Sequence, residues 1–390
     1  MIQLSNGQKK VLHNIIAWCK EDRSSTNQYI TVGGYAGTGK TTLIAVLRKR
    51  IEKLKKGSAV GFVSYTGKAS RVLRSKIKEE EALFSKDTVG TIHSLIYSPI
   101  VNEKEEIVGW KQKEKIDRDL IIIDEASMVD ELIWRHLLSY KVPIIVVGDH
   151  GQLPPISGLF HLIANPELEL DEIHRQAKGN PIIGLSIQAR QTGYVPPGIY
   201  GETVRKFSKN DHDYQETLGD LLSNYSPDTL ILCGYNKTRK RLNAHIRAML
   251  GFTSLVPEVG DRVICLRNNH EKHIFNGMIG TLVEINNVVG EFFKAKIQMD
   301  GEDGVYKGYI SKEQFTSDSA LNFTNKRSRI IGGDLFDFGY ALTVHKAQGS
   351  QANRVILFEE RFSKMDDEQW RRWLYTGITR AEKELYIIPQ

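Results

Sequence analysis

The chain has 390 residues, of which 41% are hydrophobic and 26% charged, an ordinary globular composition that excludes disorder and fibrous repeats as the main state. This length exceeds what a single hydrophobic core serves, so we expect two or three domains. No run approaches the ~20 apolar residues of a membrane span, and the first residues lack the apolar centre of a signal peptide. We therefore expect no membrane association and no secretion.

Charge and cysteine content set weaker limits on partners and compartment. The formal net charge is +6, from 53 Lys and Arg against 47 Asp and Glu, which permits a nucleic-acid partner without requiring one. Cys19, Cys233 and Cys265 lie far apart and form no C-x-x-C, which argues against a disulfide framework or a zinc cluster. A reducing, cytoplasmic compartment is the expectation.

The first half of the chain alternates apolar strands with amphipathic helices. Strands are expected at 29–32, 59–63, 120–123 and 144–147, and helices at 41–54 and 68–78. This alternation predicts an α/β fold with a parallel sheet covered by helices on both faces. Ligands of such sheets bind beyond the carboxyl ends of the strands, where three of these strands end in glycine-rich or acidic residues.

The second half begins and ends in the same style but changes in between. Strands are expected at 229–233, 340–344, 355–358 and 385–388, and a helix at 237–250. From about 255 to 325 the pattern is one of short strands, at 262–266, 280–285 and 292–299, separated by turn signals such as Asn276-Gly277. The change predicts a small antiparallel β-barrel inserted into a second α/β domain.

A charged segment from Pro99 to Lys115 stands apart from both patterns. It carries Ile107, Val108 and Trp110 among charged residues. An exposed hairpin and a solvated loop anchored by the tryptophan both fit this composition, and the sequence does not decide between them.

Residues 34–41, Gly-Tyr-Ala-Gly-Thr-Gly-Lys-Thr, fit the pattern G-x-x-x-x-G-K-[ST] of a phosphate-binding loop. Glycines let the backbone N–H groups surround a phosphate, and the following helix directs its positive end at the same anion. Lys40 would reach the β- and γ-phosphates, and the Thr41 hydroxyl would bind Mg²⁺. An apolar strand before the loop and an amphipathic helix after it favour this reading over a glycine-rich turn that binds nothing.

An acidic pair, Asp124-Glu125, follows the apolar run 120–123. Asp124 would hold Mg²⁺, directly or through water, and Glu125 would orient and deprotonate the attacking water. Most Asp-Glu pairs are solvated surface, but a pair at the end of a buried strand downstream of a phosphate loop predicts nucleotide hydrolysis. A protein that only binds nucleotide has little need for Glu125.

The ordered set of motifs resembles superfamily 1 helicases, in particular the 5′-to-3′ group that includes RecD-type and phage Dda-type enzymes. Besides the phosphate loop and Asp124-Glu125-Ala126-Ser127, the segments that carry the resemblance are 6–8 (NGQ), 65–69 (YTGKA), 91–94 (TIHS), 148–155 (GDHGQLPP), 172–176 (EIHRQ), 343–349 (TVHKAQG) and 375–381 (YTGITRA). The set in this order is specific, whereas the shortest segments alone are weak signals.

The resemblance implies a fold of two RecA-like, parallel-sheet domains with ATP between them. The implied bounds are 1–175 for the first domain, 176–254 with 326–390 for the second, and 255–325 for an inserted SH3-like β-barrel. It also identifies the segment at about 98–116 as a small version of the family's strand-separating pin.

The resemblance assigns roles residue by residue. It implies catalytic roles for Glu125, Gln152, Arg175 and Arg380, with Gln152 sensing the γ-phosphate and the arginines stabilising its charge. ATP contacts are implied for Gln8, which would read adenine, and for Gly34, Gly37, Thr38, Gly39, Lys40, Thr41, Thr42, Gln348 and Gly349, and metal contacts for Thr41 and Asp124. DNA contacts are implied for Thr66, Lys68, His93, Thr343, His345 and Lys346, which suit phosphate oxygens rather than bases.

Several of these residues could instead have a purely structural or surface role. Arg175 and Arg380 could be surface salt-bridge partners, His93 and His345 could be structural histidines, and Gln8 could be a solvated glutamine near the N-terminus. The sequence leaves these alternatives open.

The leading hypothesis is an ATP- and Mg²⁺-dependent helicase that moves 5′ to 3′ on single-stranded DNA and unwinds forked duplexes. We expect a monomeric motor in a bacterial cell or a phage-infected host. The alternatives are a translocase or RNA-directed helicase with the same motor, and a nucleotide-switched DNA-binding module. The presence of Glu125, Gln152 and Arg380 together counts against the module, because mere binding does not require them.

Overall fold

The computed structural model describes residues 4–21, 28–101, 107–155, 160–172, 179–267, 269, 272, 274, 276–287, 290–300, 304–317 and 333–389. The chain divides into two compact units. Unit 1 comprises Met1–Ile100 and Gly109–Gln191, and unit 2 comprises Val101–Val108 and Thr192–Gln390. Arg175 lies outside the described residues. No helix of the described ranges is long and apolar enough to cross a membrane.

Unit 1 is built on a six-stranded sheet in the order β3-β2-β6-β7-β1-β8, and every described pairing in it is parallel. Its strands are β1 (Tyr29–Gly34), β2 (Val60–Ser64), β3 (Thr88–Thr91), β6 (Leu120–Asp124), β7 (Ile144–Gly148) and β8 (Leu168–Leu170). The four central strands are almost continuously apolar because they are buried on both faces. The predicted parallel sheet is therefore confirmed.

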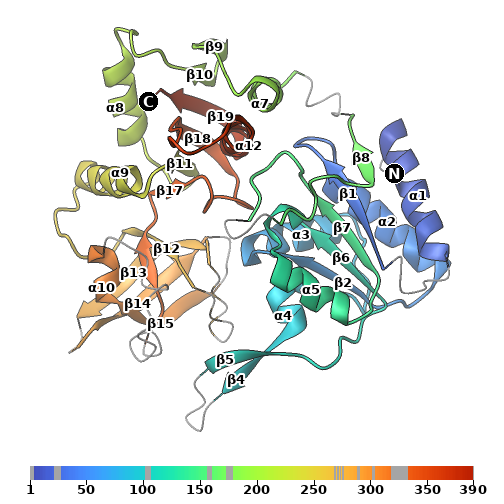
Figure 1. Cartoon of the computed structure of the whole chain (residues 1–390). Helices are drawn as coiled ribbons and strands as arrows, with labels where there is room; N and C mark the ends of the chain where they lie inside the picture. The colour runs from blue at the N-terminus through green and yellow to red at the C-terminus, as the bar shows by residue number, and fades with distance from the viewer. Residues whose placement is uncertain are drawn as a thin grey trace. The chain divides into compact units, whose positions relative to one another are not determined.

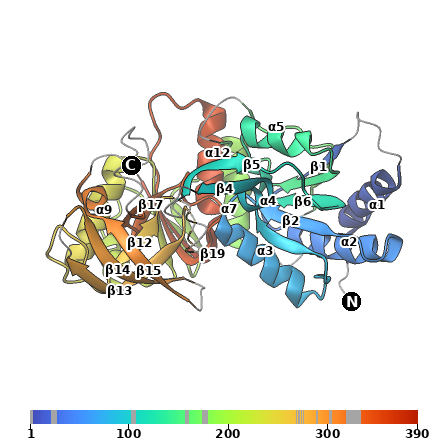
Figure 2. The same cartoon turned by 90° about the horizontal axis from the view of Figure 1, so that it is seen from below.

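Helices cover both faces of this sheet, as Figure 2 shows, with α2 and α3 on one side and α5 on the other. One hydrophobic core joins the sheet to α1 (Asn6–Lys20), α2 (Lys40–Leu54) and α3 (Gly67–Glu79). A second core joins it to α4 (Ile92–Ile96), the 3₁₀ turn η1 (Ala126–Met128) and α5 (Glu131–Ser139). The helix α7 (Pro181–Thr192) ends at the boundary with unit 2.

Strands β4 (Tyr97–Val101) and β5 (Ile107–Gln112) pair with each other in a two-stranded sheet of their own. They extend away from the six-stranded sheet in Figure 1. Of the two alternatives for Pro99 to Lys115, the hairpin is the one that forms. Trp110 lies on β5 and is 40% exposed.

Unit 2 contains a second six-stranded sheet in the order β17-β11-β18-β19-β10-β9, parallel except for the edge strand β9. Its strands are β9 (Gly198–Gly201), β10 (Val204–Lys206), β11 (Thr229–Cys233), β17 (Ala341–Thr343), β18 (Ala352–Phe358) and β19 (Ala381–Ile388). Its helices are α8 (Tyr214–Ser223), α9 (Asn236–Met249) and α12 (Asp367–Ile378). The predicted strands and helix of this part are present within a few residues of their expected ends.

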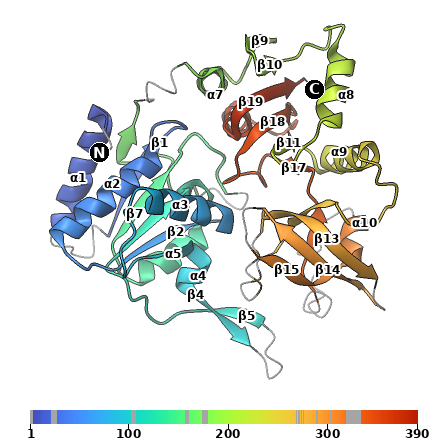
Figure 3. The same cartoon turned by 180° about the vertical axis from the view of Figure 1, so that it is seen from behind.

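Between α9 and β17 the chain forms a five-stranded antiparallel sheet in the order β15-β14-β13-β12-β16, drawn in orange in Figure 3. It consists of β12 (Arg262–Cys265), β13 (Ile279–Asn287), β14 (Phe292–Met299), β15 (Val305–Ser311) and β16 (Phe336–Phe338), with the short helix α10 (Lys312–Thr316). An isolated bridge pairs Ile310 of β15 with Asp334, just before β16. The inserted sheet has its own hydrophobic core.

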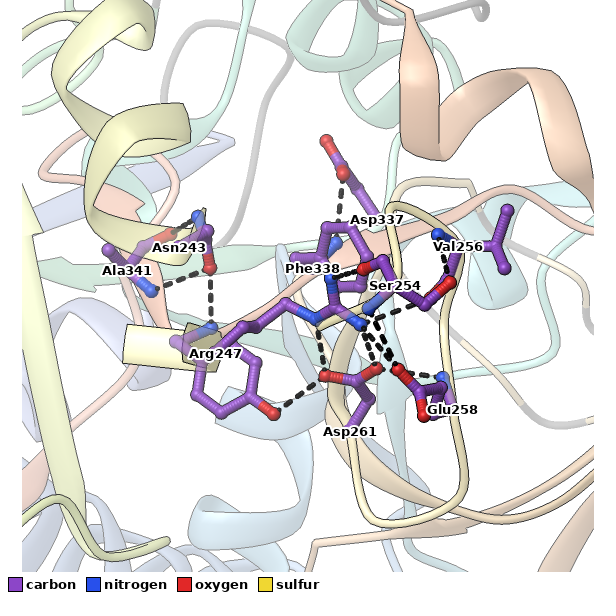
Figure 4. A network of polar contacts seen from close by, with 10 residues as sticks. Asn243, Arg247, Ser254, Val256, Glu258, Asp261, Asp337, Phe338 and Ala341 are labelled. Carbon is purple, nitrogen blue, oxygen red and sulfur yellow. Dashed lines mark hydrogen bonds and ion pairs between the residues drawn. The ribbon is translucent and has the colours of Figure 1, made fainter. Parts of the chain in front are cut away.

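Both connections of this inserted sheet are fixed to α9 (Figure 4). Asn243 accepts hydrogen bonds from the backbone N–H groups of Tyr340 and Ala341 at 2.9 and 3.1 Å, which holds the chain leaving the insertion. Arg247, one turn further on, donates to both carboxylate oxygens of Asp261, which precedes β12. Because these side chains are buried, the network is a part of the core of unit 2.

Candidate functional site

The phosphate-binding loop connects β1 to α2, as predicted. Gly37 and Gly39 adopt φ angles of +80° and +75°, which favour glycine. A Cβ atom at Gly34 would lie 2.7 Å from Oγ1 of Thr38 and 3.0 Å from Cβ of Leu170. The loop therefore requires glycine at these three positions for different reasons: two for backbone conformation and one for space.

Lys40 and Thr38 bind the loop itself in this structure. Nζ of Lys40 donates to the carbonyls of Gly34 and Tyr35 at 2.8 and 3.1 Å, and Oγ1 of Thr38 donates to the Tyr35 carbonyl at 2.8 Å. Thr41 and Thr42 lie half-buried in the first turn of α2. The Lys40 ammonium is thus engaged by backbone carbonyls of the loop itself.

Gln8 is buried, so it is not the solvated glutamine that stood as the alternative to an ATP contact. Its side chain completes a capping box with Ser5 at the start of α1. Its amide also donates to the carbonyls of Thr38 and Gly39, at 3.1 and 3.5 Å. The spacing Ser5-x-x-Gln8 was a signal for the capping box, but nothing in the sequence indicated the contact with the loop.

Asp124 and Glu125 stand at the carboxyl end of β6, a strand of the same sheet. The backbone N–H of Glu125 donates to Oδ1 of Asp124 at 2.9 Å, and Glu125 itself adopts a left-handed conformation with φ of +56°. Burial raises the pKa of the Asp124 carboxyl to about 7; the Glu125 carboxylate adds to this effect, and the Lys40 ammonium opposes it. Oε2 of Glu125 is buried without a hydrogen-bond partner among the described residues.

Such an orphaned carboxylate oxygen calls for a ligand, because an unsatisfied buried acceptor is destabilising. A water molecule that donates a hydrogen bond, or a metal ion, would satisfy this oxygen. Neither here nor in the other described ranges does a group of three or more His, Cys, Asp or Glu side chains form a metal site by itself. The donor set at the loop and at β6, a lysine, a threonine hydroxyl and two carboxylates, fits a magnesium-bound triphosphate.

Gln152 follows the carboxyl end of β7, the strand between β6 and β1. Asp149 is fully buried and accepts hydrogen bonds from the Gly151 N–H at 3.0 Å and from Nε2 of Gln152 at 3.3 Å. Because β6, β7 and β1 are neighbours, the motifs that follow them share one edge of the sheet.

The candidate DNA contacts of unit 1 lie on α3 and α4. Thr66 caps α3, where its Oγ1 accepts from the Ala69 N–H, and Lys68 is half-buried in the first turn. His93 lies beside the rings of Tyr65 and Tyr97, and its Nδ1 is buried without a hydrogen-bond partner among the described residues. Burial lowers the pKa of His93, which favours the neutral ring.

Most of the candidate residues of unit 2 lie at the end of β17 and in the segment that follows it. Thr343, His345 and Lys346 are half-buried, and burial lowers the pKa of His345 and of Lys346. Gln348 is buried, and Gly349 has a φ of +72°. These residues come together at the end of one strand of unit 2.

Arg380 is buried, which is inconsistent with a surface salt bridge. Its guanidinium donates to the Thr376 carbonyl at 3.0 Å, the Ser350 carbonyl at 3.2 Å and the Thr379 hydroxyl at 3.2 Å. All three acceptors are neutral.

The sequence model of a family described as an AAA domain matches residues 3–211, and that of the UvrD-like helicase C-terminal domain matches residues 338–388. The first match spans more than half of the chain, so the chain belongs to this family. The prediction of a superfamily 1 helicase of the RecD-type and phage Dda-type group is confirmed.

Among curated proteins, the chain is similar to the ATP-dependent DNA helicase dda of Enterobacteria phage T4, with 26% identity over 99% of both chains. It is 25% identical to the RecBCD enzyme subunit RecD of Buchnera aphidicola, over 97% of this chain and 74% of the relative. It is 26% identical to the ATP-dependent RecD2 DNA helicase of Deinococcus radiodurans, over 94% of this chain but 47% of that longer protein.

Among solved structures, a Pif1 helicase from Bacteroides in complex with ADP-AlF3 and single-stranded DNA has a similar fold. The TM-score is 0.58 at 18% identity, covering 99% of this chain and 92% of that one. This likeness concerns the fold.

Proposed function

We propose that the chain is an ATP-dependent DNA helicase that moves 5′ to 3′ on single-stranded DNA and separates duplex strands. One observation supports this most: the neighbouring strands β1, β7 and β6 end in a phosphate loop, a buried Asp149–Gln152 pair and the acidic pair with its orphaned Glu125 oxygen. The phosphate loop can bind a nucleotide, Gln152 can contact its γ-phosphate, and Glu125 can accept a proton from water. Together they suit hydrolysis of the nucleotide as well as its binding.

In this proposal Lys40 leaves the loop carbonyls and binds the β- and γ-phosphates, with Thr41 and Asp124 holding Mg²⁺, which neutralises phosphate charge when bound. Glu125 accepts a proton from the attacking water, and Gln152 contacts the γ-phosphate. Gly34, Gly37, Thr38, Gly39 and Thr42 shape the phosphate cradle. Gln8 holds the loop through the carbonyls of Thr38 and Gly39, in addition to the adenine contact that its family role implies.

Arg175 and Arg380 are the proposed arginines for the γ-phosphoryl charge, and Gln348 and Gly349 the proposed ATP contacts of the second domain. For Arg380 to act, its three bonds within unit 2 must be exchanged for phosphate oxygens. Because its present acceptors are neutral and a phosphate is charged, the hydrogen bonds to phosphate would be the stronger ones.

The proposed DNA track consists of Thr66, Lys68, His93, Thr343, His345 and Lys346. Hydroxyl, ammonium and imidazole N–H groups suit the sugar–phosphate backbone, which a motor that passes over any sequence must grip. The proposed domains are 1–175, 176–254 with 326–390, and 255–325 as an SH3-like barrel, with β4 and β5 as the pin.

A strand-displacement assay with 5′-tailed and 3′-tailed duplexes tests this function. We expect ATP-dependent displacement of the 5′-tailed substrate, and its loss in Lys40→Ala and Glu125→Gln. DNA-stimulated ATP hydrolysis without displacement of either substrate would instead support a translocase. No stimulation of hydrolysis by DNA would contradict both.

A further inference from the structure

The ring of Tyr35, the second residue of the phosphate loop, touches two other parts of unit 1. Its centroid lies 4.2 Å from that of the His150 ring, and His150 follows Asp149 in the segment 148–155 that also contains Gln152. The Arg190 guanidinium carbon lies over the Tyr35 ring, 3.2 Å from its centroid. We call these three side chains the Tyr35 stack.

The backbone of Tyr35 is tied to the nucleotide-binding lysine. Its carbonyl accepts hydrogen bonds from Nζ of Lys40, from Oγ1 of Thr38 and from the Thr38 N–H, at 3.1, 2.8 and 3.3 Å. A lysine that turns toward phosphates must release this carbonyl. One residue therefore connects the lysine, through its backbone, with His150 and Arg190, through its ring.

Arg190 lies in the last turn of α7, and Gln191, the next residue, is the last of unit 1. Its Nη1 is buried with no hydrogen-bond partner in the described part of the chain. Asp149 and Glu169 contribute negative charge around the stack. No ion pair within 4.0 Å is found for Arg190 among the described residues, so its contact with the Tyr35 ring is one restraint on the end of α7, beside the burial of Ala189.

We propose that Arg190 is a positioning residue that couples the state of the phosphate loop to helix α7, and through the continuous chain to unit 2. This inference rests on the proposed function, since it concerns how nucleotide binding reaches the rest of the motor. When Lys40 exchanges the Tyr35 carbonyl for phosphate, the Tyr35 peptide is released, the ring shifts relative to Arg190, and the restraint on α7 changes. A motor needs such a route, because differential contacts in two states are what drive a conformational change.

The test compares the parent chain with Arg190→Ala, Arg190→Lys, Tyr35→Phe and Tyr35→Leu. A control is Arg205→Ala, which removes a guanidinium lying 4.3 Å from the ring of Phe207 in unit 2, together with its ion pairs to Asp211 and Asp213. One readout is the amide hydrogen exchange of α7 with and without a non-hydrolysable ATP analogue and Mg²⁺. The other is kcat and KM for ATP, with and without single-stranded oligo-dT.

In the parent we expect the analogue to change exchange in α7 at least twofold, and in Arg190→Ala and Tyr35→Leu we expect no such change. Stimulation of kcat by DNA falls at least fivefold in these two variants, while KM for ATP changes less than threefold. Tyr35→Phe keeps the ring and at least half of the stimulation. Arg190→Lys, which lacks the planar group, lies between, and Arg205→Ala behaves as the parent.

Parent-like exchange and stimulation in Arg190→Ala would overturn the inference and leave the helicase function intact. A rise in KM with unchanged stimulation would also overturn it, because Arg190 would then serve binding alone. An α7 response that depends on Arg190 in a chain without helicase activity would support the inference while contradicting the proposed function.

Discussion

The substitution Asp261→Asn should weaken the junction between α9 and the inserted sheet more than any change of an exposed charge. Asp261 is fully buried and accepts four hydrogen bonds. Two come from Nε and Nη2 of Arg247 at 2.8 and 2.9 Å, one from the Tyr340 hydroxyl at 2.8 Å and one from the Glu258 N–H at 2.8 Å (Figure 4). Asparagine keeps one acceptor oxygen but directs an NH₂ group at a donor.

The expected cost follows from the burial of the partner. The Arg247 side chain is 5% exposed, so the variant leaves a guanidinium charge out of water without its carboxylate. Breaking a buried pair in this way typically costs 3–5 kcal/mol. Arg247 keeps the carbonyls of Ser254 and Val256 and the half-exposed Glu258 carboxylate at 3.8 Å, so we expect the lower end of this range, about 3 kcal/mol. The double variant Arg247→Met/Asp261→Asn should cost at least ~1 kcal/mol less than the sum of the single changes, since it removes the buried guanidinium that the single change leaves without Asp261.

Amide hydrogen exchange of α9 and β12 measures the loss of stability at this junction. It does not require that the two units unfold in one cooperative transition. The control is Glu284→Gln on β13, whose partner Lys296 and own side chain are each 43% exposed, so its loss should cost much less than the loss of the buried pair. A cost below ~1 kcal/mol for Asp261→Asn, or equal costs for both variants, would refute the reasoning.

Three further predictions concern unit 1. Glu125→Gln should lower DNA-stimulated kcat by about 10²–10⁴-fold while fluorescent ATP still binds, and retained hydrolysis would remove Glu125 from its role. Gly34→Ala should abolish ATP binding in a filter assay because its Cβ would meet Thr38 and Leu170. The control Gly219→Ala on α8, where nothing lies within 4 Å, should bind normally. Folding raises the pKa of Asp124 from 3.8 to about 7, so between these values the folded chain binds the extra proton and its stability falls as pH rises. Thermal denaturation without metal should show this slope in the parent and less of it in Asp124→Asn, and equal slopes would contradict the assignment.

The features predicted well from sequence are those that depend on neighbours along the chain. The runs 120–123 and 144–147 are continuously apolar because both faces of a central parallel strand are covered, and the pattern states this directly. The phosphate loop is likewise local, because the glycines and Lys40 that shape it lie within eight residues. For the hairpin at 97–112 the sequence left two alternatives open, since charged residues suit an exposed hairpin and a loop equally.

Contacts between distant positions could not be predicted in this way. The amide of Gln8 meets carbonyls 30 and 31 residues away, and Arg190 meets the ring of a residue more than 150 positions earlier. Arg247 reads in the sequence as one more basic residue of an amphipathic helix, although it is buried against Asp261. Which distant residue each one meets depends on the topology of the whole sheet, and a single sequence carries no signal for it.

The partners of four cations, the buried Arg48, Arg247 and Arg380 and the half-buried Lys40, divide them into two classes. Arg48 and Arg247 are each paired with a carboxylate of similar burial, Asp87 and Asp261, and such a pair is stable only while both members stay in place. The hydrogen bonds that Lys40 and Arg380 donate to described residues go to neutral carbonyl and hydroxyl oxygens. A neutral acceptor satisfies the donor without neutralising its charge, so a phosphate can replace it with a gain in charge-assisted hydrogen bonding. The first class therefore holds the fold together, and the second remains available to an anionic ligand, which supports Lys40 and Arg380, rather than Arg48 or Arg247, as the cations of a nucleotide-driven cycle.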